Sequence, residues 1–151
     1  MKHNSATPYV AAVIMFEQDG KFAHLLRQNT PWMSNFYGLP GGKVEKDESA
    51  IDAAVRETKE EVGVTIDTKD LTLCLTLHRK SDDSSWVDFI FKAEKWEGEL
   101  YNAEPHKHKE LKWFAPDKLP KNIIPVTKFY FESIASGKRF RDYGFKEPSM
   151  M

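Results

Sequence analysis

The sequence predicts an α/β fold in which a mixed β-sheet carries helices on its faces. Apolar, β-branched segments of strand length recur along the chain, a polar segment with helix-capping signals interrupts them, and a second helical segment follows near the end. Strands precede, separate and follow the helices without a regular βαβ rhythm. A mixed sheet is therefore favoured over a doubly wound parallel sheet.

The first third of the chain predicts strands joined by tight turns. Residues 9–17 (YVAAVIMFE) are typical of a buried strand, Asp19-Gly20 of the turn after it, and residues 22–27 (FAHLLR) of the return strand of a hairpin. Residues 35–40 (NFYGLP) form a short candidate strand, which the following glycines end.

A helix is expected over residues 49–62. Ser49-x-x-Asp52 is typical of a capping box, and Glu48 adds negative charge near the positive end of the helix dipole. Gly63 stands where a left-handed C-terminal cap is expected.

The second half of the chain predicts three more strands and a second helix: residues 71–78, 86–95, 110–114 and 124–136, in that order. The polar residues 81–85 (SDDSS) would join the first two strands as a hairpin, and Gly137 would end the helix. The tail from about residue 138 is charged with aromatic interruptions, and its order is left open.

The composition is that of one globular domain spanning residues 1–151, with 40% hydrophobic and 30% charged residues. A formal net charge of −1 argues against a dedicated nucleic-acid binder, so no nucleic-acid polymer is expected as a partner. Cys74 is the only cysteine, which favours a reducing compartment. The sequence shows neither a signal-peptide core at its start nor an apolar run of roughly 18 residues. We therefore expect a cytoplasmic protein without membrane contact.

The segment 42–64 (GKVEKDESAIDAAVRETKEEVGV) concentrates the chemistry of the chain. On a helix, Glu57, Glu60 and Glu61 leave the same face, because they are related by i, i+3 and i+4. Ala53 and Ala54 lie one turn earlier and are small enough to let a ligand approach. Clustered carboxylates repel one another, and a hard cation such as Mg²⁺, or Mn²⁺ in its place, removes that repulsion.

Other residues of the segment can support such a metal site. Gly41 and Gly42 allow a close backbone approach, and Arg56 can tether a carboxylate from its position beside Glu60. A cation bridging phosphate oxygens would activate water for attack on phosphorus. The implied reaction is hydrolysis of a phosphoanhydride.

Residues 42–64, with the pattern G-x5-E-x7-R-E-x-x-E-E-x-G, and the preceding Leu39-Pro40-Gly41 resemble the signature of the Nudix hydrolases. The resemblance implies an α/β/α sandwich around a mixed sheet, a loop-helix-loop catalytic motif, and hydrolysis of a nucleoside diphosphate linked to a moiety X. The chain departs from the signature at Thr58, where the family prefers an aliphatic residue.

The resemblance also implies roles for individual residues. Glu60 and Glu61 would be the principal metal ligands, with Gly41 in the same site, and Glu57 a ligand or the base that acts on water. Arg56 would orient a glutamate in catalysis, while Gly42, Glu48 and Gly63 support the motif. Some members add an acidic residue from another loop. Glu104 is the candidate here, either as this catalytic acid or as a surface residue.

The substrate class favoured by the loose resemblance of residues 104–120 is a (d)NTP, cleaved to a nucleoside monophosphate and pyrophosphate. ADP-ribose or a nucleotide sugar is the alternative substrate, and a non-hydrolytic nucleotide sensor is the alternative function. Arg27, Phe36, Tyr37 and Trp86 are the expected substrate-binding residues, with Trp32 a further aromatic residue that could stack on a base. His106 and His108 are expected in a solvated loop. A monomer and a homodimer both remain open.

Overall fold

Two β-sheets and two α-helices make up the computed structural model, which describes residue 5 and residues 7–145. The large sheet has the order β5 (Gly41–Lys43), β1 (Tyr9–Met15), β7 (Ser85–Ala93), β6 (Leu71–Lys80) and β9 (Phe140–Tyr143). The small sheet contains β2 (Glu17–Gln18), β3 (Lys21–Arg27), β4 (Tyr37–Gly38) and β8 (His108–Phe114). The helices are α1 (Ala50–Val62) and α2 (Pro125–Ala135), and a 3₁₀ turn covers Thr68–Asp70.

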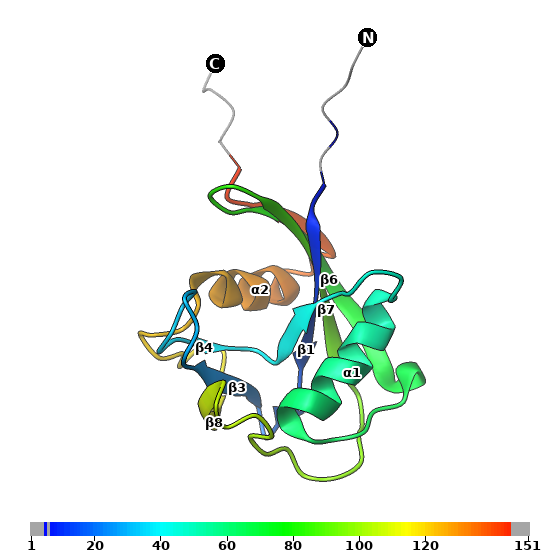
Figure 1. Ribbon diagram of the computed structural model, residues 1–151, viewed down its shortest axis with the longest axis vertical. Coiled ribbons are helices and arrows are strands. Elements are labelled where there is room, and N and C mark those ends of the chain that lie inside the picture. The colour runs from blue at the N-terminus through cyan, green and yellow to red at the C-terminus, as the bar shows by residue number, and fades with distance from the viewer. Residues whose placement is uncertain (1–4, 6, 146–151) are drawn as a thin grey trace.

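The large sheet is mixed, as predicted. Its strand β1 runs parallel to β7 but antiparallel to β5, and β6 runs antiparallel to β7 but parallel to β9. The two helices cover opposite faces of this sheet (Figure 1). Alternation along β1 supplies both layers, since Ile14 packs in the cluster with Val62 of α1 and Met15 packs in the cluster with Phe131 of α2. The expected α/β architecture is confirmed.

The expected hairpin at the start of the chain is only partly present. Residues 9–17 do not form one strand, because β1 ends at Met15 and belongs to the large sheet, while β2 belongs to the small sheet. Phe16 lies between them, fully buried. Only β2 pairs with β3, through a turn in which Asp19 (φ 53°) and Gly20 (φ 78°) are both left-handed. This conformation is the one that suits a two-residue hairpin.

Two strands were not predicted. The segment after Pro40, expected to end a strand, forms β5, which pairs with the edge of β1. Gly41 has a φ of 151°, and a Cβ there would lie 2.3 Å from the carbonyl oxygen of Ala12, so the close strand approach requires glycine. The tail also continues the fold, because Phe140–Tyr143 pairs with β6 as β9. Residues 146–151 of the tail lie outside the described residues.

Helix α1 begins and ends as predicted. The Ser49 hydroxyl accepts a hydrogen bond from the Asp52 N–H at 3.1 Å, and Gly63 adopts a left-handed φ of 73°. Ala53 and Ala54 do not flank an open ligand site, however. Both are fully buried in the core, where their small side chains let the helix pack closely on the sheet. Within the described residues, no helix has the length and apolarity needed to cross a membrane.

The cap of α1 provides a test of the fold. Ser49→Ala should lower the free energy of unfolding by about 1 kcal/mol, because the Asp52 N–H loses its acceptor at the helix start. Urea unfolding followed by circular dichroism measures the change. Ser136→Ala, at an exposed position after α2, is the matched control and should change stability by less than about 0.5 kcal/mol. Equal effects of the two substitutions would contradict the capping role.

Candidate active site

The guanidinium of Arg56 gathers the carboxylates on one side of α1. It donates two hydrogen bonds to Glu48, at 2.8 and 3.0 Å, and one each to Glu57 at 3.0 Å and Glu60 at 3.2 Å. A further hydrogen bond reaches the Lys43 carbonyl at 3.2 Å. The paired guanidinium lowers the pKa of Glu48 to about 2, and Glu48 in turn raises the pKa of Arg56. Arg56 therefore fixes the loop before the helix to the helix itself.

Glu61 lies on the other side of this group and is almost completely buried, at 8% exposure. Its carboxylate accepts the backbone N–H of Gly41 at 2.7 Å, so β5 and α1 are joined through it. Burial raises the pKa of Glu61 well above its usual range, and the nearby Glu57 raises it further. Burial also raises the pKa of Glu57, against the opposing effect of Arg56. For both carboxylates, burial outweighs the stabilising contacts that the protein provides.

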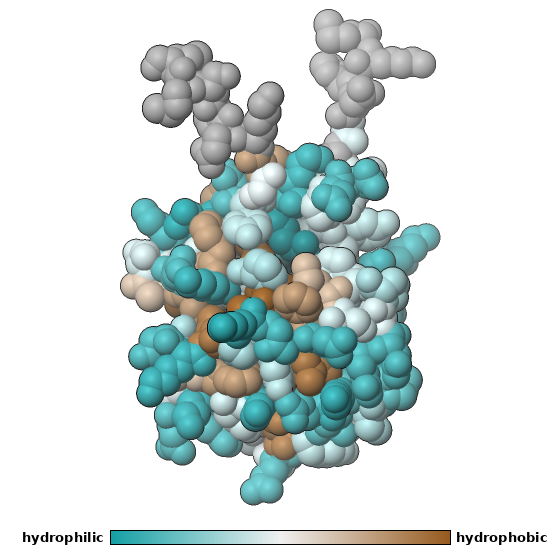
Figure 2. All heavy atoms as spheres, turned by 90° about the vertical axis from the view of Figure 1, so that its left-hand side faces the viewer, coloured by the Kyte–Doolittle hydropathy of each residue, from teal (hydrophilic) through white to brown (hydrophobic). Residues whose placement is uncertain are grey.

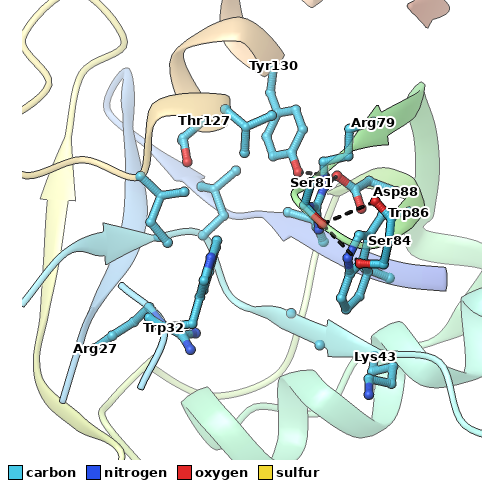
Figure 3. Close-up of a pocket in the computed structure, with 18 residues that line it drawn as sticks. Arg27, Trp32, Lys43, Arg79, Ser81, Ser84, Trp86, Asp88, Thr127 and Tyr130 are labelled. Atoms are coloured by element: carbon cyan, nitrogen blue, oxygen red, sulfur yellow. Dashed lines mark hydrogen bonds and ion pairs between the residues drawn. The ribbon is translucent and has the colours of Figure 1, made fainter. Parts of the chain in front are cut away.

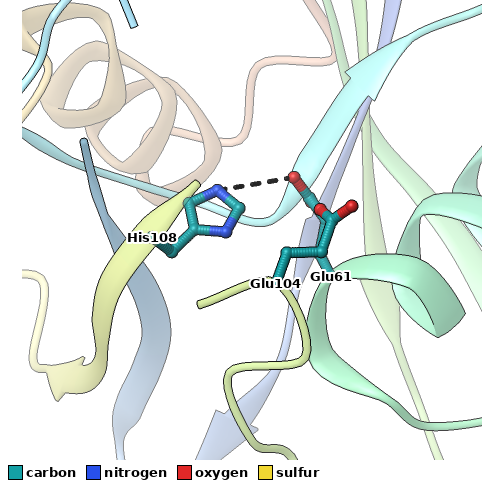
Figure 4. Close-up of side chains that lie close together, drawn as sticks. All are labelled: Glu61, Glu104 and His108. Atoms are coloured by element: carbon teal, nitrogen blue, oxygen red, sulfur yellow. Dashed lines mark ion pairs between the residues drawn. The ribbon is translucent and has the colours of Figure 1, made fainter. Parts of the chain in front are cut away.

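Glu104 and His108 complete a second group around Glu61 (Figure 4). Each of the three residues offers a ligand atom, and these atoms all lie within 4.8 Å of one another. The Nε2 of His108 is 3.7 Å from Glu61 Oε2, but burial lowers the pKa of the imidazole to about 4, so at neutral pH it is not a cation. His108 is buried rather than solvated as expected. It begins β8, two residues before the start of the strand predicted from the sequence.

These residues suit a divalent cation. Burial is the main cause of the raised pKa of Glu57 and of Glu61, and the like charge of Glu104 raises both further. A hard cation with oxygen ligands would compensate these carboxylates. A larger residue would not fit at position 42, because a Cβ on Gly42 would lie 2.4 Å from Glu57 Oε1. Glu60 is more exposed, with 48% of its side chain accessible, and is held by Arg56.

A cavity of about 500 Å³ opens beside this acidic group, on the opposite side of β5. Figure 2 shows apolar side chains gathered near the middle of the face on that side of the molecule, with hydrophilic ones around them. Figure 3 shows Trp32 facing the polar side chains of Ser81, Ser84 and Asp88 across the cavity. The residues that line it are Ala11, Val13, Arg27, Trp32, Gly38, Leu39, Gly41, Gly42, Lys43, Arg79, Ser81, Ser84, Trp86, Asp88, Ile124, Val126, Thr127 and Tyr130.

Cations stack on both tryptophans of the cavity. The Arg27 guanidinium lies 5.0 Å from the Trp32 ring centre and donates to the Trp32 carbonyl at 3.2 Å. On the other wall, the Arg79 guanidinium lies 4.7 Å from the ring centre of Trp86. Trp32 is half exposed, so part of its ring remains available to a ligand. The cavity thus combines aromatic surface with positive charge.

Asp88 is a buried carboxylate in the wall of the cavity, and it is not among the residues predicted from the sequence. Its Oδ2 accepts hydrogen bonds from Arg79 Nε and from the Tyr130 hydroxyl, both at 2.6 Å. Burial, and then the Asp88 charge, raise the pKa of Tyr130 well above its usual range. Among the described residues, Asp88 Oδ1 has no hydrogen-bond partner. A charged residue within the apolar strand WVDFIFKA was the available signal.

The expected substrate-binding residues divide into two groups. Arg27 and Trp86 line the cavity, whereas Phe36 and Tyr37 do not. Tyr37 is 6% exposed, donates its hydroxyl to Glu110 and packs edge-on against Phe114. The sequence placed these aromatics near the motif, but strand β4 turns the Tyr37 side chain into the small sheet. Trp32, from the preceding loop, takes the place beside the cavity.

Comparisons with known proteins identify relatives of this chain. The sequence profile of the NUDIX domain matches residues 6–135. The chain is 32% identical over 114 residues to an ADP-ribose pyrophosphatase of Methanocaldococcus jannaschii, covering 76% of this chain and 66% of that protein. It is 33% identical over 96 residues to an 8-oxo-dGTP diphosphatase of Escherichia coli, covering 62% and 73%. It spans only 13% of the m7GpppN-mRNA hydrolase of Saccharomyces cerevisiae, at 29% identity and with 86% of this chain covered.

A solved structure gives the same result. The crystal structure of a MutT NUDIX hydrolase from Burkholderia pseudomallei is similar, with a TM-score of 0.75 and 31% identity. The match covers 83% of this chain and 97% of that one. The fold is therefore that of a solved NUDIX hydrolase.

The buried carboxylate leads to a prediction about stability. Because the pKa of Glu61 is raised in the folded protein, the free energy of unfolding falls as pH rises from the ordinary value of 4.5 through the folded pKa. Glu61→Gln keeps an acceptor for Gly41 but removes the buried charge. In metal-free buffer at pH 7.5, it should raise the melting temperature by about 2–4 °C.

A divalent cation should stabilise the wild-type protein more than the Glu61→Gln variant. The wild-type protein should gain about 2.7 kcal/mol at a Mg²⁺ concentration of 100 times the Kd, and Glu61→Gln should lose most of that gain. Differential scanning calorimetry with EDTA and with Mg²⁺ measures both effects. Glu99→Gln, at an exposed position, is the control. An unchanged response to Mg²⁺ in the Glu61 variant would remove this residue from the metal site.

Proposed function

The chain belongs to the NUDIX family, and on that premise we propose that it is a Mg²⁺-dependent hydrolase of nucleotide phosphoanhydrides. The preferred substrate is a (d)NTP, which is cleaved to a nucleoside monophosphate and pyrophosphate. One observation carries this proposal. The glycine strand β5 lines the aromatic cavity and also holds Glu61 through the Gly41 N–H. A nucleotide in the cavity therefore has its phosphates beside the acidic group.

The register of the large sheet supports this placement. Ala11 of β1 pairs with Lys43 on one side and with Asp88 on the other, so these two residues lie two strands apart. Two strand spacings correspond to about 10 Å. This distance suits a nucleotide whose base lies near Asp88 and whose phosphates extend past Lys43.

The metal site is assigned to Glu57, Glu60 and Glu61, together with Gly41. Gly41 contributes its carbonyl oxygen, because its N–H is donated to Glu61. When bound, Mg²⁺ neutralises phosphate charge and makes a water molecule nucleophilic. The cation would also compensate the negative charge of Glu61, which has no Lys or Arg partner among the described ion pairs, and that of Glu57, which Arg56 compensates only in part.

The remaining residues of the acidic group position the reactants or take the proton. Arg56 holds Glu57 and Glu60 in place and is stabilised by Glu48. Glu104 makes no ion pair with Arg56 among the described contacts and lies beside Glu61, so we assign it as the base that accepts the proton of the attacking water. Glu104 also forms an ion pair with Lys107, at 3.4 Å.

The cavity supplies the recognition of the nucleotide. The exposed ring of Trp32 can stack on a base, and Trp86 extends the aromatic surface. Arg27 and Lys43 supply positive charge for the phosphates. The free Oδ1 of Asp88 is available to accept an N–H of the base once the ligand reaches this wall.

Other substrates and one other function can be distinguished from this proposal by experiment. ADP-ribose is the alternative substrate, favoured by the relative of that name. A nucleotide sugar is the third substrate class. A nucleotide sensor without turnover is the alternative function, and the full set of glutamates in the motif argues against it. The relative that acts on mRNA adds a capped oligonucleotide to the substrates that should be tested.

A substrate panel tests the proposal. Purified protein with Mg²⁺ should release pyrophosphate from one or more (d)NTPs faster than it releases phosphate-containing products from ADP-ribose, nucleotide sugars or a capped oligonucleotide. Glu60→Gln and Glu104→Gln should each lower kcat by about 10²-fold or more. Turnover that is unchanged in these variants contradicts the site. Tight nucleotide binding by calorimetry without turnover favours the sensor.

The role of Trp32 in stacking is tested separately. Trp32→Ala should raise KM for the preferred nucleotide by about tenfold or more, because stacking on an aromatic ring contributes about 1–3 kcal/mol per base. The change in kcat should be small. Phe140→Ala removes another exposed aromatic residue, on β9 and outside the cavity, and should leave KM unchanged. Equal KM values for the wild type and the Trp32 variant would place the base elsewhere.

A further inference from the structure

Two amide side chains at the end of β3 bind the loop that carries Glu104. Gln28 Nε2 donates to the Pro105 carbonyl at 2.7 Å, and Asn29 Nδ2 donates to the His106 carbonyl at 2.8 Å. The backbone N–H of Gln28 donates to the Lys107 carbonyl at 3.0 Å. Three successive carbonyls directly after Glu104 are thus held by two residues that are far away in sequence. We call Gln28 and Asn29 the amide clamp.

The clamped loop is anchored to α1 at its other end. The Ala103 N–H donates to the Glu61 carbonyl at 3.0 Å, and the Tyr101 N–H donates to the Val62 carbonyl at 3.1 Å. Glu104 therefore lies between one anchor on the catalytic helix and another on the amide clamp. The N–H groups of Lys107 and His108 both point back to the Glu104 carbonyl, at 2.9 and 3.0 Å, so displacement of residues 105–107 would move Glu104 as well.

The amide clamp directly follows a residue of the cavity wall in the sequence. Arg27, directly before it, donates to the carbonyl of Trp32, and both residues line the cavity. Asn29 has a left-handed φ of 54°, a conformation that asparagine tolerates better than most residues. This backbone geometry directs the loop from the cavity toward residues 105–107. The clamp thus joins the segment that follows Arg27, a residue of the cavity wall, to the loop that carries Glu104.

We propose that Gln28 and Asn29 are positioning residues that hold Glu104 at the acidic group. The inference rests on the proposed function, because it assigns a role through Glu104. The clamp bonds are at the surface, so they add little to the stability of the fold. Their contribution is to the geometry of catalysis, where a misplacement of about 1 Å can cost as much as about 10²-fold in rate.

Matched variants distinguish the loss of a hydrogen-bond donor from a change in the size of the side chain. Gln28→Met keeps the length of the side chain but removes the donor, whereas Gln28→Lys keeps a donor of similar reach. Asn29→Asp keeps the shape and the left-handed tolerance but cannot donate when ionised. Asn35→Asp is the control, because Asn35 shares a left-handed φ of 68° and its side chain makes no hydrogen bond among the described residues.

The experiment is steady-state kinetics with the nucleoside triphosphate that the wild-type enzyme hydrolyses fastest. Gln28→Met and Asn29→Asp should each lower kcat by about tenfold or more, with KM changed less than twofold, and Gln28→Lys should restore most of the loss. Hydrogen exchange should become faster at the amides of Lys107 and His108 in Gln28→Met. Asn35→Asp should match the wild type in every measurement.

A double-mutant cycle completes the test. If the clamp acts through Glu104, Gln28→Met should have no further effect on kcat in the Glu104→Gln background. Additive losses, or faster exchange without a change in kcat, would overturn the proposal. If Glu104→Gln alone leaves kcat unchanged, the assignment of the base fails instead, so the two failures can be told apart.

Discussion

Repulsion among carboxylates around α1 is the constraint on which the rest of this structure depends. Arg56 pairs with Glu48, Glu57 and Glu60 on one side, whereas Glu61 has no Lys or Arg partner among the described ion pairs. Glu104 pairs with Lys107. Glu61 is nevertheless buried, and its main protein donor is a single backbone N–H. The fold therefore holds an arrangement that the protein alone compensates incompletely. Such an arrangement favours the binding of a cation and lowers the stability of the metal-free chain.

The backbone of β5 is the other part of that arrangement. As an edge strand of only three residues, it pairs with β1 on one side and contacts the acidic group through Gly41 and Gly42. The same residues line the cavity. The cavity and the acidic group thus meet at a strand too short to have been assigned from its own residues. Glycine is required at Gly41 because the neighbouring strand leaves no room for a Cβ.

Local features of the site could be predicted from the sequence, and features that depend on tertiary contacts could not. The caps of α1 and the spacing that brings Arg56 to Glu60 follow from helix geometry, so Ser49 and Gly63 are found in their expected roles. The burial of Ala53 was missed because helical projection does not show which side faces the sheet. Asp88 was missed because its importance arises from residues on β6 and α2. Glu104 was a candidate because the resemblance implied an acidic residue from another loop, but only the structure places it, together with His108, beside Glu61.

The C-terminal strand has a practical consequence for how this protein is handled. The match to the family ends at residue 135, but the large sheet continues to Tyr143 through β9. Tyr143 packs against Phe129, and the guanidinium of Arg141 lies 4.7 Å from the same ring. A chain cut at the family boundary would leave the edge of β6 unpaired and would uncover the outer side of α2, the helix that supplies Tyr130 to the cavity. Residues beyond the conventional domain limit are therefore part of the smallest unit in which this cavity keeps its walls.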